Sequence, residues 1–143
     1  MDKVSLSIGY SEDNQTETVE IYINGRKLID ILKEYEAPFA EDIAGEYEGL
    51  RPDEVFLPSK HFLGVSLDLL GDHEKIAVLD CVCGCPGCWP FLVKITIEDD
   101  RVIWSDFEQP HRGPESAGGH WKYDELGPFV FDRKQYESEL VRK

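Results

Sequence analysis

The sequence lacks any apolar run that approaches the roughly 18 residues of a membrane-spanning helix. It also lacks a cationic excess, because 15 lysines and arginines stand against 29 aspartates and glutamates, a formal net charge of −14. A surface of that sign repels nucleic-acid phosphates and anionic lipid headgroups, so we expect neither a nucleic acid nor a membrane as partner. The first residues contain no apolar stretch of signal-peptide length, and we therefore expect a cytoplasmic protein.

Cysteine is absent everywhere except in one stretch, DCVCGCPGCWP, at residues 80–90. In a reducing cytosol, stable disulfides are not expected. The CPGC segment has the C-x-x-C spacing of thiol redox centres, but reactive pairs usually stand at a helix N-terminus that stabilises the thiolate. Here the pair leads into WPFLVKITIE, which is a strand pattern. The surroundings therefore argue against redox chemistry.

Two interpretations of these thiols stay open. In the first they bind zinc, for which CPGC is a plausible knuckle, and the candidate ligands are Cys81, Cys83, Cys85, Cys88 and His111. Ribbon-type zinc sites place a second cysteine pair about 15–20 residues away, and the chain has none. A histidine, His111 or His120, would have to complete the site. In the second interpretation the thiols are unliganded and pack as small apolar side chains in a tight hairpin.

Length and composition predict a single globular domain, residues 1–143. A hydrophobic content of 41% and a charged content of 31% are those of a folded chain. No linker-like segment and no internal repeat divides the sequence. One core is therefore expected.

The N-terminal half predicts a hairpin, a helix and a long loop. Apolar residues alternate at Val4, Leu6 and Ile8 and again in residues 19–23, with the polar SEDNQTET between them, as in a hairpin with one buried face. Residues 26–36 show helical spacing, although Asn24-Gly25 just before them is also typical of a tight hairpin turn. We predict the helix. Prolines and glycines interrupt any period in residues 37–59, so we expect a loop there, with at most a helical turn.

The C-terminal half predicts a strand meander followed by a helix. The strands are expected at residues 76–83, 91–98 and 102–107, with a turn at residues 98–101. A helix over residues 133–141 has Asp132 as its N-cap, Gln135 to complete a capping box, and Phe131 to pack onto Tyr136. The predicted fold is α+β: an antiparallel sheet of about five to six strands with two packed helices, near residues 26–36 and 133–141.

A second polar motif, WSDFEQPHR at residues 104–112, resembles a catalytic triad in composition but not in geometry. Ser105 and Asp106 are neighbours in a predicted strand and point to opposite faces, and the chain has no G-x-S-x-G elbow. His111-Arg112, just beyond the strand, is either an anion site or a solvated loop pair. The tryptophans Trp89, Trp104 and Trp121 are expected in the core or at its rim.

Several segments together resemble a family of small bacterial proteins of uncharacterised function. They are INGRKLIDILKEYEAPFA, LPSKHFLG, C-x-C-G-x-x-G-C-W-P, VIWSDFEQPHR and LGPFVFDRKQYESEL, which cover most of the chain. The resemblance implies a bacterial, cytoplasmic protein and no particular activity. The family's pattern matches Cys81, Cys83 and Cys88 but varies at the position of Cys85. This favours a three-thiol site with a histidine, or no metal, over a four-cysteine zinc site.

Two classes of function follow. Residues 34–54 carry eight acids and one base, Arg51, so this segment is either a solvated face or a surface that attracts a basic protein. The first class is a protein-binding or regulatory module, immunity-like modules included, with a basic protein as partner. The second is an enzyme or metal-binding protein whose site lies at the cysteine hairpin 81–88 near His111 and Arg112. The lack of a recognisable nucleophile–base pair or phosphate loop favours the binding module over the enzyme.

Overall fold

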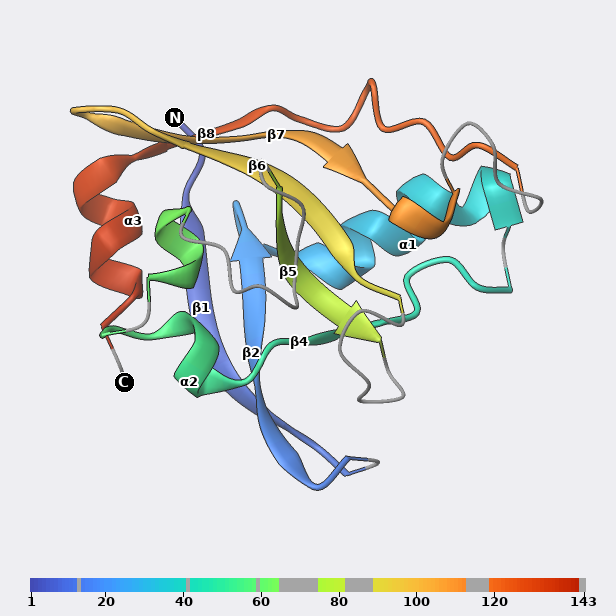
Figure 1. Ribbon diagram of the computed structural model, residues 1–143, viewed down its shortest axis with the longest axis horizontal. Helices are drawn as coiled ribbons and strands as arrows, with labels where there is room; N and C mark the ends of the chain where they lie inside the picture. Colours follow the sequence, from blue (N-terminus) through green and yellow to red (C-terminus); the bar gives the residue numbers. More distant parts are fainter. Residues whose placement is uncertain are drawn as a thin grey trace.

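The computed structural model (Figure 1) describes residues 1–12, 14–40, 42–58, 60–64, 75–81, 89–112 and 119–141. The first half of the chain contains β1 (Val4–Ser11), β2 (Thr16–Ile23), β3 (Arg26–Lys27), α1 (Leu28–Ala40), β4 (Tyr47–Gly49), α2 (Pro52–Val55) and the 3₁₀ turn η1 (His61–Leu63). The second half contains β5 (Ile76–Cys81), β6 (Phe91–Ile97), β7 (Arg101–Glu108), the 3₁₀ turn η2 (Pro110–Arg112), β8 (Phe129–Asp132) and α3 (Arg133–Glu139).

The strands form two antiparallel sheets, one with the order β1-β2-β3 and one with the order β4-β5-β6-β7-β8. The predicted α+β class, with antiparallel pairing and two packed helices, is confirmed. The division into two sheets was not anticipated. They meet where the N–H of Val19 on β2 donates to the carbonyl of Leu50, just after β4, at 2.7 Å. In Figure 1, the N-terminus lies on the side of the molecule where α3 packs.

The predicted helix 26–36 exists, but its boundaries were wrong. Asn24 and Gly25 have φ angles of +54° and +83°, which suit a tight hairpin turn, and they fold Arg26 and Lys27 back onto β2 as the short strand β3. The turn and the helix therefore both occur, one after the other. The helix begins at Leu28 and continues to Ala40, with Pro38 inside it.

The prediction of a loop over residues 37–59 was wrong in two places. The segment begins inside α1, and it contains the strand β4, whose residues Tyr47, Glu48 and Gly49 pair with Cys81, Asp80 and Leu79 of β5. A three-residue strand is too short to show a period, which explains why it escaped the sequence analysis. The predicted helical turn is present as α2, which begins with Pro52.

The predicted meander is present as β5, β6 and β7, and the turn at residues 98–101 closes with the N–H of Glu98 donating to the carbonyl of Arg101 at 2.9 Å. β5 ends at Cys81, and the rest of the predicted strand to residue 83 lies outside the described residues. The sheet also contains β8, which was not predicted and pairs with β7. The register of β6 and β7 shifts between Leu92 and Lys94, where Asp106 on β7 has a φ of +53°.

The C-terminal helix α3 has the predicted N-cap, in which the Asp132 carboxylate accepts the N–H of Gln135 at 3.0 Å. The predicted packing of Phe131 on Tyr136 is also present, with ring centroids 5.6 Å apart. The capping box was wrong, because the Gln135 side chain instead bonds both the N–H (3.3 Å) and the carbonyl (2.6 Å) of Val4. β1 is an edge strand, so its outer backbone groups have no strand partner among the described residues. The Gln135 amide bonds to these groups instead of to the N-terminus of the helix.

The core lies between the five-stranded sheet, β1, β2 and the two long helices, and its largest buried side chain is Trp104. The Trp104 indole donates to the Tyr136 hydroxyl at 3.1 Å, and this hydroxyl donates to the carbonyl of Phe62 at 2.6 Å. A buried polar group needs a partner, so this chain of hydrogen bonds fixes α3 against β7 and η1. Within the described residues, no helix is long and apolar enough to cross a membrane.

Candidate functional site

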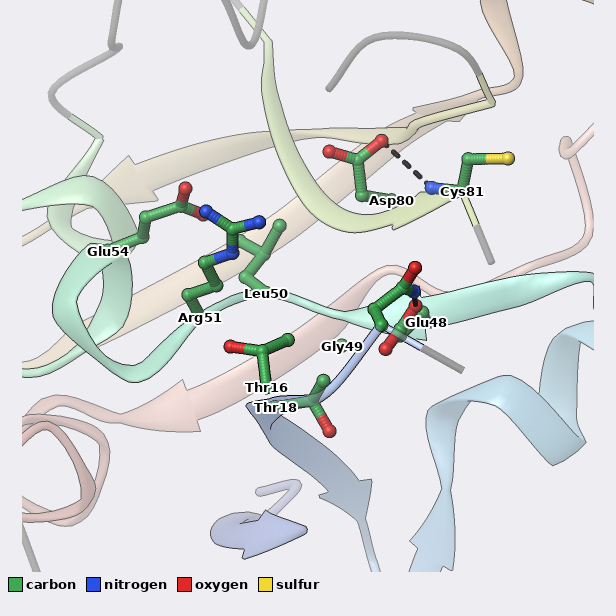
Figure 2. Close-up of a pocket in the computed structure, with 10 residues that line it drawn as sticks. Thr16, Thr18, Glu48, Gly49, Leu50, Arg51, Glu54, Asp80 and Cys81 are labelled. Carbon is green, nitrogen blue, oxygen red and sulfur yellow. Dashed lines mark hydrogen bonds between the residues drawn. The ribbon is translucent and has the colours of Figure 1, made fainter. Parts of the chain in front are cut away.

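Cys81 is the only predicted metal-site cysteine among the described residues, and it lines a small acidic cleft (Figure 2). The cleft has a volume of about 50 Å³ between β2, β4 and β5, and its carboxylates are Glu48, Glu54 and Asp80. Figure 2 shows Arg51 beside Glu54, and the Asp80 carboxylate turned toward the backbone N–H of Cys81, which it accepts at 2.8 Å. Burial raises the pKa of the Glu54 carboxyl, and the neighbouring charge of Asp53 raises it further.

The other predicted thiols, Cys83, Cys85 and Cys88, lie outside the described residues. Within the described part of the chain, no three His, Cys, Asp or Glu side chains are arranged to hold a metal ion. Cys81 itself is partly buried at the end of β5. The zinc site therefore stays a prediction, and so does the alternative function of an enzyme or metal-binding protein with its site at the predicted hairpin 81–88 near His111 and Arg112.

His111, the fifth predicted ligand, belongs to a cluster of rings and one guanidinium that we call the Trp–Arg cluster: Trp89, His111, Arg112 and Trp121. The His111 ring stacks on Trp89 with centroids 5.8 Å apart and planes at 8°. The Arg112 guanidinium carbon lies 4.8 Å from the centre of the Trp89 ring and 5.6 Å from that of Trp121. Trp89 directly follows the cysteine segment 82–88 in the sequence, so the structure places His111 against the first described residue after that segment.

A row of aromatic rings on α1 continues from this cluster. Phe39 stacks on Trp121, with centroids 5.9 Å apart and planes at 17°. One turn earlier, Tyr35 stacks on Tyr123, with centroids 5.4 Å apart and planes at 14°. The Tyr35 hydroxyl also donates to the carbonyl of Lys122 at 2.9 Å. These contacts fasten the segment that follows residue 119 to the outer side of α1.

Beside these rings lies a groove, which we call the α1 groove. It has a volume of about 520 Å³, and its lining residues are Ile31, Tyr35, Pro38 and Phe39, together with the charged Arg26, Glu34 and Glu125. Phe39 is 41% exposed although it stacks on Trp121. Arg26 is neutralised by an ion pair with Glu34 at 2.7 Å. The lining of the groove thus combines apolar and aromatic side chains with a net negative charge.

A buried carboxylate lies beneath the groove. Glu36 of α1 is fully buried and accepts hydrogen bonds from the hydroxyls of Tyr47 (2.6 Å) and Tyr123 (2.5 Å) and from the N–H of Gly45 (3.0 Å). Burial raises the pKa of this carboxyl, and the three hydrogen bonds oppose that rise. Gln109 extends the network by donating to the Tyr47 hydroxyl at 3.3 Å and to the carbonyl of Pro90 at 3.0 Å.

Sequence analysis missed the role of Glu36, which it counted among the acids of residues 34–54. A signal was present, because Leu28, Leu32 and Glu36 follow one another at intervals of four and so share one helix face. The other two members of that face are fully buried. An acid on the apolar face of a helix indicates a buried polar network rather than a solvated charge.

No protein-family model, curated protein or solved structure matches this chain. The resemblance to a family of small bacterial proteins, drawn from the motifs, therefore stays a prediction. What the chain can bind has to be argued from its own surfaces.

Proposed function

We propose that this protein is a binding module whose α1 groove recognises a basic segment of a partner protein. The observation that carries the proposal is the exposed ring of Phe39 at the edge of an apolar groove. Large apolar side chains that stay exposed beside a concave surface are typical of protein contact sites. Of the partner chemistries, a basic segment with one apolar anchor side chain fits this groove best.

The charge around the groove supports a basic partner. Glu34 and Glu125 line it, and the same helix and the turn after it carry further exposed acids, Asp30, Asp42 and Glu46. The whole chain has a net charge of −14. Opposite charges at the rim of an interface accelerate association and exclude wrong partners, while the apolar centre contributes most of the affinity. An aromatic or long aliphatic residue flanked by lysines or arginines satisfies both parts.

The wall of the groove is held rigidly, which lowers the entropic cost of binding. Tyr35 and Phe39 are each stacked on a ring of the segment 119–126, and Glu36 beneath them ties α1 to Tyr47 and Tyr123. The groove is therefore in place before a partner arrives.

The experiment is a selection of 12-residue peptides from a display library on the immobilised protein, followed by fluorescence anisotropy with the enriched peptides. We expect these peptides to carry an apolar anchor between basic residues, and their binding to weaken as salt rises. Phe39→Ser is expected to lower the affinity about tenfold or more, the loss typical of a central anchor contact. Leu57→Ser is the matched control, because Leu57 is exposed to a similar extent, 45%, and does not line the groove. Neutral or acidic peptides, or equal binding to Phe39→Ser, would contradict the proposal.

A further inference from the structure

We propose that Arg112 is the anchor of a second binding site, a cleft beside the Trp–Arg cluster that takes a carboxylate anion. This site is separate from the α1 groove and does not rest on the function proposed above. Its lining comes mainly from two described segments: the end of β7 with η2, and residues 120–124.

The guanidinium of Arg112 is held in one place. It lies over the rings of both Trp89 and Trp121, and one of its terminal nitrogens, Nη1, donates to the carbonyl of His111 at 2.8 Å. Aromatic faces attract a guanidinium and fix its plane without neutralising its charge. An arginine fixed in this way keeps its hydrogen-bonding edge in a defined direction, which is what a binding site for a planar anion needs.

The charge of Arg112 has no acidic partner among the described residues. Three other arginines, Arg26, Arg101 and Arg133, are each bonded to a glutamate side chain. Arg112 makes no such contact, in a chain with 29 acids, and its Nε is buried without a hydrogen-bond partner in the described structure. A cation that is partly removed from water and not neutralised interacts strongly with an anion that reaches it.

The cleft in front of Arg112 has the opposite charge to the rest of the protein. Its volume is about 300 Å³, and Arg112, His120, Lys122 and Asp124 line it together with Lys75 and Glu108, which form an ion pair at 2.5 Å. Once this pair is set aside, two cations face one carboxylate. In each of four other clefts among the described residues, acids equal or outnumber lysines and arginines.

The balance of charges favours a carboxylate over a phosphate. The excess is one positive charge, and both Asp124 and Glu108 line the same cleft, so a dianion meets more repulsion than a monoanion. The planar fork of a guanidinium also matches a carboxylate with two parallel hydrogen bonds. The ligand is thus a small acid or the C-terminal carboxylate of a peptide, which share this chemistry.

The test uses the indole N–H signals of the three tryptophans in ¹H–¹⁵N NMR spectra of the whole protein. Sodium acetate is titrated against sodium chloride at equal ionic strength. We expect a saturable shift of the Trp89 and Trp121 signals with acetate alone, and a weaker response to inorganic phosphate. Trp104 serves as the internal reference, because its indole is bonded to Tyr136 in the core and stays unmoved. Shifts that do not saturate, that are equal in chloride, or that are larger with phosphate overturn the proposal.

Variants locate the site. Arg112→Lys keeps the charge but loses the fork, and we expect its affinity for acetate to fall about tenfold, the factor for one charge-assisted hydrogen bond. Lys94→Gln removes an exposed charge outside the cleft and is expected to change nothing. An unshifted Trp104 signal shows that each variant is folded. Equal acetate binding by wild type and Arg112→Lys overturns the site.

A last arm distinguishes the two sources of the carboxylate. N-acetyl-Ala-Ala is compared with acetate and with its own C-terminal amide. Tighter binding of the peptide acid than of acetate, with an inert amide, assigns the cleft to a chain terminus. Equal binding of the two acids assigns it to a small free acid, and binding of the amide overturns the carboxylate site.

Discussion

A Cβ atom added to Gly49 would lie 2.1 Å from the carbonyl oxygen of Val19. The two residues belong to different sheets, Gly49 to β4 and Val19 to β2, so the sheets touch backbone to backbone at this point. The next residue, Leu50, accepts the N–H of Val19 at 2.7 Å. Only a residue without a side chain allows this approach, and the hydrogen bond depends on it.

We therefore predict that Gly49→Ala lowers the free energy of unfolding by about 3 kcal/mol or more, because the backbones have to separate to admit the methyl group. Urea unfolding followed by tryptophan fluorescence measures it. Gly9→Ala is the matched control in a strand, since its new methyl group would meet only the flexible side chain of Glu20. We expect this control to cost less than about 1 kcal/mol. A loss for Gly49→Ala as small as that of the control would mean that the sheets do not need this contact.

The elements that could be predicted from the sequence are those marked by short-range sequence patterns. In the β1–β2 hairpin, apolar and polar residues alternate on both sides of a polar turn. The helix α3 is predicted by an N-cap at Asp132 and by an apolar contact from Phe131 to Tyr136. In both, the pattern that predicts the element lies within one continuous stretch of the sequence. The second half of the capping box failed for the opposite reason, because Gln135 finds a partner in Val4, far away in the sequence.

The features that could not be predicted depend on such distant contacts. The strand β4 has only three residues, and its pairing with β5 decides its conformation. The Trp–Arg cluster also depends on distant contacts, since Arg112 meets Trp89 and Trp121 only after folding. The sequence did indicate His111-Arg112 as a possible anion site, but it offered no sign that two indoles hold the arginine.

The buried Glu36 predicts a pH dependence of stability. Burial raises the pKa of its carboxyl in the native state above the ordinary 4.5, the value in the unfolded state. At a pH between the unfolded and the native pKa, the native state therefore holds a proton that the unfolded state has released. The contribution of Glu36 is therefore fully present below pH 4.5 and is lost as the pH rises through the native pKa. In Glu36→Gln, which resembles the protonated acid, this loss is absent.

We expect the free energy of unfolding of the wild type to fall, relative to that of Glu36→Gln, as the pH rises from 4.5 through the raised native pKa of Glu36. The difference between the two proteins removes contributions from other groups, such as Glu54, whose pKa burial also raises. Urea unfolding at a series of pH values measures it. Parallel pH profiles for the two proteins would show that Glu36 does not change its protonation on folding in this range.

The packing of α3 predicts that a substitution at Leu140 lowers the free energy of unfolding strongly, whereas one at the neighbouring Val141 lowers it little. Leu140 is 1% exposed, and its carbonyl accepts the N–H of Leu57 at 2.9 Å, which ties the end of α3 to the segment after α2. Leu140→Ala is expected to cost about 2–5 kcal/mol, from lost burial and the cavity left behind. Val141→Ala is the control, because Val141 is 57% exposed, and we expect less than about 0.5 kcal/mol. Similar costs for both would mean that the helix is peripheral to the core.

The last prediction concerns the four cysteines. Cys81 ends β5 and is partly buried. A thiol of this kind packs as a small apolar group. We expect denatured protein, after anaerobic purification, to show four free thiols, and elemental analysis of the same sample to find zinc well below one per chain. A chelator is then expected to leave the unfolding curve unchanged, since metal binding in structural sites is part of the folding free energy. One zinc per chain that is lost in Cys83→Ser or Cys88→Ser, together with destabilisation by the chelator, would instead establish a metal centre at the hairpin. His111→Gln then decides whether the histidine stacked on Trp89 is its fourth ligand, because this variant loses zinc if the imidazole is one of the ligands.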